Sequence, residues 1–506
     1  MDSLDYLNIT GLSLIDWIII VIYLTLSLGL GLFFAKKVKS MTDFVSAGRN
    51  IGLFLGVASM AGTEMGLITI MYSAQKGFSG GFAAFHIAVV AGVITFLVGL
   101  SGFIVVPLRK LKVLTIPEFY EKRFGKDVRV LGGLLLTFGG VLNMGLFLKV
   151  GALFLVGVAG LSPSLLPWVM TALLILILFY TCMGGMWSVI MTDFMQFCVM
   201  SIGLFVVVGI SFATIGWNNL FDIVLEQKGI AGFDPLSAEG DFGLSYVLWM
   251  MFTAGLVSCA IWPTAVARAL AMKSETLVKK QYMITSITFM IRFLIPYFIG
   301  ISAFVYFTIE KPEFMPLFGG QLDTLYAFPF YIKDILPIGL IGFFTAAMIA
   351  AFMSTHDGYL LCWSSVITQD IIAPLAKKKL SDKQRLFWTR VSIVGIGIYI
   401  WYWGLFYQGS DDIWDYMAIT GAIYFTGAFA LLVGGLYWKK ASRVGAMAAL
   451  ISGLTALLGL GPIKQAVGLT QFTGAHIGLF TICLTLFVMV IFSLLFPDKN
   501  IREVKI

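Results

Sequence analysis

The sequence has few charged residues. Asp, Glu, Lys and Arg make up 12% of its 506 residues and 59% are hydrophobic, whereas about 25% of an ordinary soluble domain is charged. A chain with so little charge cannot cover an apolar core of this size with a polar surface. The composition therefore excludes a water-soluble fold and predicts a protein that lies in a lipid bilayer.

Histidine and paired cysteine are also scarce. The three histidines stand far apart, too few for a haem or a two-metal centre. The five cysteines have no Cys-x-x-Cys spacing and lie in apolar stretches, so we expect free thiols that pack as small hydrophobic groups. The sequence also has no Walker lysine loop, no HExxH and no histidine ladder. These absences argue against a membrane enzyme and against an ATP-driven pump.

Apolar segments recur along the whole chain. A spanning helix needs about 20 mostly apolar residues. Hydropathy gives thirteen such segments, at residues 12–34, 50–76, 82–108, 128–157, 162–182, 186–214, 243–267, 281–308, 335–366, 386–407, 412–437, 444–463 and 474–496. The sequence therefore predicts an all-α polytopic membrane protein in which residues 1–506 form a single transmembrane domain.

Charge is distributed unequally between the predicted connections. If the N-terminus lies outside, the inner connections hold most of the Lys and Arg residues, as in 109–127 and 367–385. The outer connections lean acidic, with Asp222, Asp241 and Asp412 among them. This asymmetry predicts a cell-membrane protein with its N-terminus outside and its C-terminus in the cytoplasm. The formal net charge of +7 thus belongs to membrane-flanking loops, and it predicts no nucleic-acid partner.

Five ionisable residues interrupt the predicted spans. They are Glu64, Lys149, Asp193, Arg292 and Asp357. Ionisable groups inside a bilayer are costly, and as a rule they mark ion or substrate pathways. Structural roles stay open on the sequence alone. Lys149 could neutralise Glu64 as an ion pair, Asp193 could meet water at a helix end, and Arg292 could extend toward the interface.

The ninth predicted span adds buried oxygen atoms. Ala351 lies one helical turn before Ser354 and Thr355, so its carbonyl lies near both hydroxyls. Together with carbonyls from an unwound helix, these oxygens suit a hard monovalent cation. The alternative is that both hydroxyls bond only to the backbone of their own helix.

Two predicted spans are interrupted at polar or Gly-rich sequences. The second reads Gly-Thr-Glu-Met-Gly over residues 62–66, and the seventh reads Ala-Ile-Trp-Pro-Thr over residues 260–264. Such interruptions are typical of discontinuous helices, which present backbone carbonyls and helix ends to ions and solutes. The two breaks stand five spans apart, which predicts inverted repeats of spans 2–6 and 7–11.

Several segments resemble, in order, motifs of the sodium/solute symporter family, which includes bacterial proline, sugar and sialic acid symporters. The resemblance extends over about residues 50 to 455. It rests on Thr115–Phe119 with Arg123–Gly125, Gly184–Gln196, Arg268–Ser274, Ala351–Asp370 and Gly435–Gly445. It implies a LeuT-type core of five plus five helices. Residues 12–34 would form a leading helix, 50–214 the first repeat, 243–437 the second, and 444–496 two trailing helices.

The resemblance also implies a sodium site. Its ligands would be the carbonyls of Gly62, Met65 and Ala351 and the hydroxyls of Ser354 and Thr355.

Two carboxylates, Asp193 and Glu64, match positions that in some members of the family shape a second cation site or take part in coupling the cation to the solute. Those members look to have serines where this chain has Asp357 and Gly358.

The solute side departs from the best-known branches. The aromatic inner gate of the sugar branch falls at Ser258, and its span-three carboxylate falls at Ala88, which argues against a sugar. Lys149 lies on the span from which a basic residue meets the substrate carboxylate in the sialic acid branch, so the resemblance implies a carboxylate or a zwitterion. The residues expected to line the solute pocket are Thr69, His86, Asn143, Lys149 and Trp262.

The expected function is sodium-coupled import of a small organic solute by alternating access, without an obligate protein partner. A proton-coupled porter of the same fold is the alternative, because Glu64, Asp193 or Asp357 could carry a proton.

Overall fold

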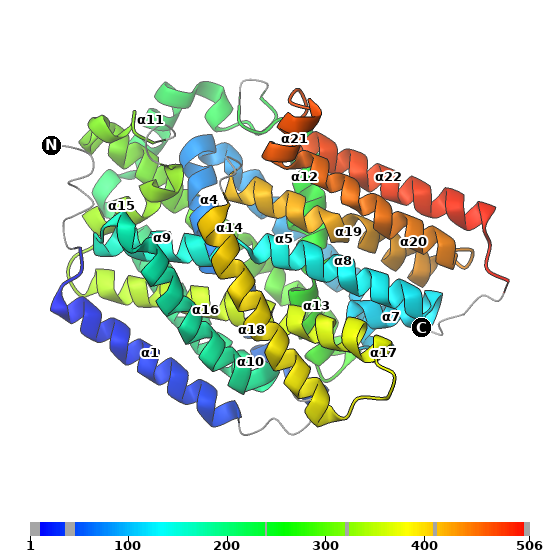
Figure 1. Cartoon of the computed structure of the whole chain (residues 1–506). Helices are drawn as coiled ribbons and strands as arrows, with labels where there is room; N and C mark the ends of the chain where they lie inside the picture. The colour runs from blue at the N-terminus through cyan, green and yellow to red at the C-terminus, as the bar shows by residue number, and fades with distance from the viewer. Residues whose placement is uncertain (1–10, 36–45, 238–239, 319–322, 408–411, 500–506) are drawn as a thin grey trace.

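A computed structural model describes residues 11–35, 46–237, 240–318, 323–407 and 412–499. Within these ranges the chain is helical apart from short connections and an isolated bridge between Ile51 and Met272. The predicted all-α polytopic fold is confirmed (Figure 1).

The first half of the chain contains eleven α-helices within the described residues. They are α1 (Leu14–Ala35), α3 (Leu53–Glu64), α4 (Leu67–Gly80), α5 (Phe85–Ser101), α6 (Val105–Lys110), α7 (Ile116–Phe124), α8 (Lys126–Met144), α9 (Phe147–Ala159), α10 (Leu166–Ile215), α11 (Trp217–Lys228) and α12 (Leu244–Met250).

The second half begins with the π-helical η6 (Met251–Ile261) and contains a second π-helical segment, η9 (Ile367–Ile372). Its α-helices are α13 (Pro263–Ala271), α14 (Glu275–Glu310), α15 (Ala327–Ile335), α16 (Leu340–Val366), α17 (Ala373–Leu375), α18 (Asp382–Phe406), α19 (Ile413–Tyr437), α20 (Arg443–Ser452), α21 (Gly461–Val467) and α22 (Gly474–Leu495).

Nine helical segments of the described chain are long and apolar enough to cross a membrane. A tenth is formed by Arg443–Gly459 and Gly461–Val467 if this pair, bent by 89°, is counted as one span. A shorter apolar helix, Pro163–Phe179, and the Leu53–Glu64 half-helix lie in further predicted spans. A helix lies in each of the thirteen predicted segments, but the number of crossings stays a prediction.

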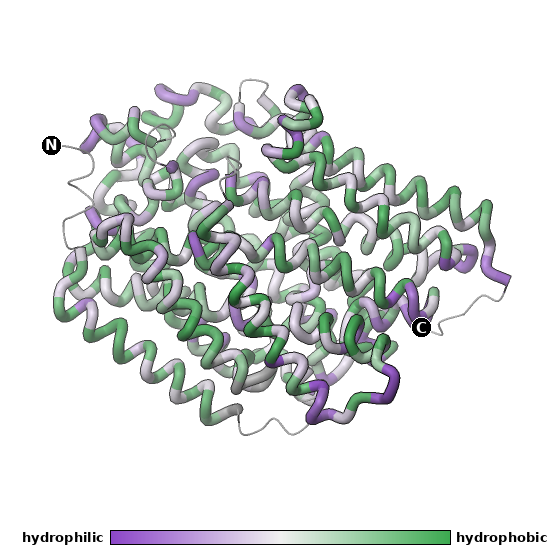
Figure 2. Tube along the Cα trace, in the orientation of Figure 1, coloured by the Kyte–Doolittle hydropathy of each residue, from purple (hydrophilic) through white to green (hydrophobic). Residues whose placement is uncertain are grey.

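The helices divide into a buried centre and a lipid-facing periphery. The apolar segments of α16 and α19 are 89% and 83% buried inside the protein, whereas those of α1 and α22 are only 28% and 39% buried. Figure 2 shows hydrophobic residues along both α1 and α22, which follow opposite edges of the bundle. The central pair is therefore where polar side chains can meet away from lipid.

A buried carboxylate attaches the peripheral helix α1 to the start of α16. Asp16 Oδ1 accepts hydrogen bonds from the backbone N–H groups of Gly339 and Gly342, at 2.8 and 2.9 Å. A Cβ atom on Gly342 would lie 2.5 Å from the Asp16 Cα atom, so the two helices approach closely. The carboxylate satisfies free donors at a helix N-terminus, where a negative charge is favourable.

The break expected in the second span is confirmed. Helix α3 ends at Glu64, Met65 and Gly66 are non-helical, and α4 begins at Leu67. Gly66 has an ordinary extended backbone (φ −77°, ψ 164°), so glycine is needed here for space. A Cβ atom at this position would lie 1.9 Å from Thr355 Oγ1 on α16. The broken helix is thus pressed against the ninth span.

The break in the seventh span is also confirmed. The π-helix η6 ends at Ile261, Trp262 is extended (φ −65°, ψ 124°), and α13 begins at Pro263. Proline disfavours a helical residue before it and fits the first position of a helix. Both interruptions therefore have a local cause, while the limits of the two repeats stay a prediction.

Gly66→Ala is expected to destabilise the protein by about 1–3 kcal/mol, because overpacking a tight contact costs this much. Gly52→Ala is the matched control. Gly52 precedes α3 with a similar backbone (φ −81°, ψ 169°), but a Cβ atom added there would have no neighbouring atom within 4 Å. Unfolding of the purified variants in detergent measures both effects, and equal losses of stability would contradict the close contact with Thr355.

Candidate functional site

A central cavity lies where the two broken helices meet α14, α16 and α19. It contains about 660 Å³ of space not occupied by atoms, part of which is open to solvent. The aromatic part of its lining consists of Tyr72, Trp262, Phe293, Tyr359, Trp414 and Phe425. The polar part consists of Thr63, Glu64, Thr69, Asn143, Thr253, Ser258, Arg292 and Thr355.

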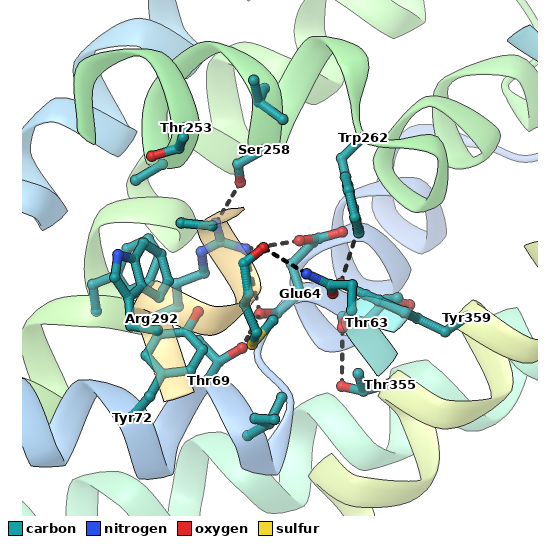
Figure 3. A pocket seen from close by; sticks show the side chains of 18 of the residues that line it. Thr63, Glu64, Thr69, Tyr72, Thr253, Ser258, Trp262, Arg292, Thr355 and Tyr359 are labelled. Atoms are coloured by element: carbon teal, nitrogen blue, oxygen red, sulfur yellow. Dashed lines mark hydrogen bonds and ion pairs between the residues drawn. The ribbon is translucent and has the colours of Figure 1, made fainter. Parts of the chain in front are cut away.

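An ion pair between Glu64 and Arg292 occupies one wall of this cavity (Figure 3). Arg292 Nη1 lies 3.1 Å from Glu64 Oε2 and also donates to the Glu64 carbonyl oxygen at 3.3 Å. Thr264 Oγ1 donates to the other carboxylate oxygen, Oε1, at 2.6 Å. The last residue of α3 is thus joined to α14 and to α13.

The guanidinium of Arg292 is held on several sides. Its Nη2 atom donates to Ser258 Oγ at 2.6 Å. Its central carbon lies 3.9 Å from the ring centre of Phe289 and 4.5 Å from that of Phe293, distances at which a cation is attracted to an aromatic ring. The side chain does not extend to the interface, since only 3% of the residue is exposed.

The ion pair between Lys149 and Glu64, which the sequence left open, is not formed. Glu64 pairs with Arg292, and the Lys149 ammonium instead donates to the backbone carbonyl of Tyr407 at 3.4 Å. Arg292 comes from the eighth span, 228 residues along the chain from Glu64, and only the fold brings the two together.

A second polar cluster surrounds Asp193 on α10, which is fully buried. Its Oδ1 atom accepts a hydrogen bond of 2.5 Å from Ser354. Its Oδ2 atom accepts from Ser59 at 2.6 Å and from Thr63 at 3.0 Å, and lies 3.4 Å from Arg268 Nη2. The carboxylate therefore contacts three other helices and is paired with a cation, and it does not lie at a helix end.

The hydroxyls of Ser354 and Thr355 both bond to other helices. Ser354 donates to Asp193 on α10, and Thr355 Oγ1 donates to the Thr63 carbonyl on α3 at 3.1 Å. Arg268 on α13 donates to the Thr63 hydroxyl at 2.6 Å. The alternative, in which both hydroxyls bond only to the backbone of their own helix, is therefore wrong.

The five expected sodium ligands lie on the two elements that this contact joins. Gly62 and Met65 belong to the end of α3 and its break, and Ala351, Ser354 and Thr355 belong to one turn of α16. All five are buried. A Cβ atom on Gly62 would lie 3.1 Å from the Asp193 carbonyl oxygen. The Thr355–Thr63 hydrogen bond brings the two elements into contact, and the role of the five residues as ligands stays a prediction.

Three of the five residues expected to line the solute pocket do line the cavity, namely Thr69, Asn143 and Trp262. Thr69 Oγ1 donates to the Glu64 carbonyl at 3.1 Å. Asn143 donates from Nδ2 to the Met417 carbonyl at 2.7 Å, and its Oδ1 atom has no partner among the described residues.

The other two expected residues, His86 and Lys149, lie outside the cavity. His86 contacts the Ala83 carbonyl at 2.7 Å through Nδ1, and its ring packs on Phe242 and Tyr246. The Lys149 ammonium contacts the Tyr407 carbonyl instead, and the spacing of motifs along the sequence does not give such contacts.

Asp357 has a different neighbourhood from Asp193. Its Oδ1 atom accepts a hydrogen bond of 2.6 Å from Thr181 on α10, and the residue does not line the cavity. Sequence reasoning missed the cavity roles of Tyr72, Tyr359 and Trp414. Aromatic residues are common in membrane helices, so nothing in their local sequence marked these three.

The profile of the sodium:solute symporter family matches residues 44–453. The chain is 25% identical over 489 residues to sodium/proline symporter 2 of Staphylococcus saprophyticus, covering 91% of this chain and 89% of that protein. It is 23% identical to a sodium/proline symporter of Staphylococcus aureus, with 91% and 88% covered.

Among solved structures, a Na⁺-coupled sialic acid symporter in a substrate-bound outward-open state has the same fold. It superposes with a TM-score of 0.81 at 21% identity, over 96% of this chain and all of that one. A manganese transporter of Eremococcus coleocola aligns with a TM-score of 0.50 at 15% identity, over 89% and 98% of the two chains. The matched profile spans most of the sequence, so the chain belongs to the sodium:solute symporter family and is a multi-pass cell-membrane protein that couples solute transport to sodium.

Proposed function

We propose that sodium binds between the break of the second span and the ninth span. The ligands are the carbonyl oxygens of Gly62, Met65 and Ala351 and the hydroxyl oxygens of Ser354 and Thr355. Such an all-oxygen set suits a hard monovalent cation. At a helix break, carbonyl groups are released from their intrahelical partners and become available to an ion.

The hydrogen bond from Thr355 to the Thr63 carbonyl is the observation that carries this proposal. It directs a hydroxyl of α16 toward the last turn of α3. Asp193 adds a negative charge beside the site through its 2.5 Å contact with Ser354, and Arg268 offsets that charge from the other side. Sodium therefore enters a region whose fixed charges are already balanced.

We further propose that the transported solute is a small zwitterion bound in the central cavity. Glu64 and Arg292 present opposite charges on one wall. Two buried polar atoms of cavity-lining residues have no partner among the described residues, Arg292 Nε and Asn143 Oδ1. The first needs an acceptor such as a carboxylate, and the second needs a donor such as an ammonium group.

The named relatives support this solute class, because two of them are sodium/proline symporters and proline is a zwitterion. A sugar would bring no charge to either member of the ion pair. We therefore propose Arg292, which lines the cavity, as the partner of the solute carboxylate in place of Lys149.

The two sites are coupled through neighbouring residues of one helix end. Thr63 receives the contact from the sodium side, Glu64 pairs with Arg292 on the solute side, and Met65 is a sodium ligand. An ion that fixes the break thereby also fixes the ion pair that receives the solute. Sodium entry down the membrane potential supplies about 2.3 kcal/mol per charge per 100 mV, and low internal sodium favours release.

We also propose that the N-terminus lies outside and the C-terminus in the cytoplasm. The supporting asymmetry is visible in the described connections, where residues 109–127, 268–280 and 367–385 are rich in Lys and Arg. Further basic residues that contribute to the prediction lie outside the described residues, namely Lys36, Lys37, Lys39, Arg502 and Lys505.

Ser354→Ala is expected to raise the sodium concentration for half-maximal uptake by about ten-fold or more. A hydrogen bond to a charged group contributes about 1.5–3 kcal/mol, and about 1.4 kcal/mol corresponds to a factor of ten. Ser364→Ala is the matched control, since Ser364 is equally buried on α16 but bonds to the Leu361 carbonyl of its own helix. Uptake is measured with sodium replaced by choline at constant pH. Unchanged sodium dependence in Ser354→Ala would contradict the assignment.

Arg292→Lys is expected to weaken binding of zwitterions by about ten-fold or more. Lysine keeps the positive charge beside Glu64 but loses the planar fork that pairs with a carboxylate. Lys149→Met, which removes a cation outside the cavity, should leave binding nearly unchanged. The measurement is the sodium-dependent thermal stabilisation of purified protein by amino acids, monocarboxylates and sugars. A larger loss in Lys149→Met than in Arg292→Lys would reverse the two roles.

A cysteine placed at Asp222 on α11 is expected to react with a membrane-impermeant maleimide in intact cells. A cysteine placed at Lys379 should react only after the cells are opened. The unsubstituted protein supplies the background from its own thiols, and the opposite labelling pattern would invert the proposed orientation.

A further inference from the structure

A polar cavity lies between α7, α8 and the segment from η9 to α18, at the end of the bundle where Figure 1 shows α7 next to α17. It contains about 720 Å³ of space not occupied by atoms, part of which is open to solvent, and we call it the α8–α18 cavity. Its polar lining consists of Glu118, Glu121, Lys126, Arg129, Gln369 and Arg385. None of these residues lines the central cavity, so this space is distinct from the proposed solute site.

The carboxylates of this cavity are already bonded to the protein. Glu121 Oε2 pairs with Arg129 Nη1 at 2.5 Å. Glu118 Oε2 accepts a hydrogen bond from the Leu114 backbone N–H at 2.7 Å, and Glu118 Oε1 lies 4.0 Å from the Lys122 ammonium. Each carboxylate therefore has its own donor, and neither requires a cation from solution.

The donor groups of the cavity are less well satisfied. Gln369 is only 2% exposed, and its Oε1 atom accepts from Arg385 Nη1 at 2.5 Å, whereas its Nε2 atom has no partner among the described residues. The charge of Arg129 is compensated, because its Nε atom also donates to Asp370 Oδ1 at 2.8 Å. Lys126 and Arg385, in contrast, form no ion pair with any carboxylate in the described part of the chain. A buried donor without a partner is costly, so the group that the cavity lacks is a negatively charged acceptor.

The backbone around the cavity also favours an anion. Gln369 lies in the π-helical segment η9, and π-helical insertions are frequent at functional sites. Helix α8 begins at Lys126, and no side chain caps its start. The first N–H groups of a helix have no intrahelical partner, and they attract phosphate and other anions. The start of α8 thus adds partial positive charge next to the Lys126 ammonium.

We propose that the α8–α18 cavity binds a phosphate group, with Lys126 and Arg385 as its counter-charges and Gln369 Nε2 as a neutral donor. A phosphate spreads its negative charge over several acceptor oxygens, which fits two cations and an amide N–H from three different elements. The group belongs either to free phosphate or to the headgroup of an anionic lipid, which basic pockets between membrane helices also bind. The proposed orientation places the connections 109–127 and 367–385, which hold most of this lining, in the cytoplasm, where both sources occur.

Potassium phosphate is expected to raise the midpoint of thermal unfolding of the purified full-length protein in a maltoside detergent. The reference is potassium chloride at the same ionic strength and pH, so that only the specific anion differs. A ligand that binds the folded state alone stabilises it in proportion to its occupancy. Sodium and solute are left out, so neither of the other two proposed sites contributes to the result.

Two substitutions test the residues that hold the phosphate. Arg385→Gln is expected to raise the phosphate concentration for half-maximal stabilisation by about ten-fold or more, the loss that corresponds to one hydrogen bond to a charged group. Gln369→Glu keeps an oxygen atom for Arg385 and replaces the free N–H donor by a carboxylate oxygen, so it is expected to abolish the response to phosphate. It also keeps the size of the side chain, and it carries the test if Arg385→Gln does not fold.

Arg390→Gln is the matched control. It removes another arginine of α18, which donates to the Cys182 carbonyl at 3.0 Å and does not line the cavity. This variant loses the same net charge as Arg385→Gln and should keep the response of the unsubstituted protein. A loss that follows net charge alone would instead appear equally in both arginine variants.

A second titration, with phosphatidylglycerol or phosphatidylcholine added to the detergent solution, separates the two sources. Stabilisation by phosphatidylglycerol that Arg385→Gln abolishes identifies a lipid headgroup, whereas stabilisation by inorganic phosphate alone identifies a soluble anion; both support the site. The proposal is overturned if neither phosphate nor phosphatidylglycerol stabilises the unsubstituted protein. A full response in Gln369→Glu, or an equal loss in Arg390→Gln and Arg385→Gln, would overturn it as well.

Discussion

The arrangement of this transporter follows from the requirement that charge inside a membrane be paired. Two ion pairs lie at its centre, Glu64 with Arg292 and Asp193 with Arg268. An isolated charge at this depth would be strongly unfavourable, whereas a pair with additional hydrogen bonds is tolerated. The hydroxyls of Ser59, Ser258 and Thr264, among others, supply those bonds. The pairs thereby fix the helices α3, α10, α13 and α14 around the break in the second span.

The two ion pairs lie beside different proposed binding sites. Asp193 lies beside the hydroxyls of α16, where we propose the sodium site, and Glu64 lines the cavity, where we propose that the solute binds. Between them runs a short piece of backbone that includes Thr63. Because this segment is not helical beyond Glu64, a small change in its dihedral angles alters both neighbourhoods at once. Tight coupling of ion and solute then requires no long pathway through the protein.

Sequence reasoning located most of the chemistry but not its pairing. Hydropathy marked Glu64, Asp193 and Arg292 because a charge in an apolar run is conspicuous, and glycine and proline marked both helix breaks. The sequence left Lys149 open as a partner of Glu64 and did not identify Arg292, since a one-dimensional pattern gives the cost of a buried charge and not the neighbour that compensates it.

The same limit applies to the residues that line the solute pocket. Thr69, Asn143 and Trp262 line the cavity, but His86 and Lys149 do not, because the residues that a helix turns toward a cavity depend on packing against partners far away in the chain.

The number of spans also stays a prediction. Helix α10 continues from Leu166 to Ile215 through a region where hydropathy predicts two separate crossings.

The two hydrogen bonds that Asp16 accepts from Gly339 and Gly342 connect the leading helix to the start of α16. They tie the leading helix, which is mostly surrounded by lipid, to the helix that carries Ser354 and Thr355. Because both bonds go to backbone N–H groups at the start of α16, a displacement of α1 from α16 would leave two donors without a partner. The cost of exposing these donors to lipid keeps the leading helix, despite its mostly lipid-facing surface, attached to the centre of the bundle.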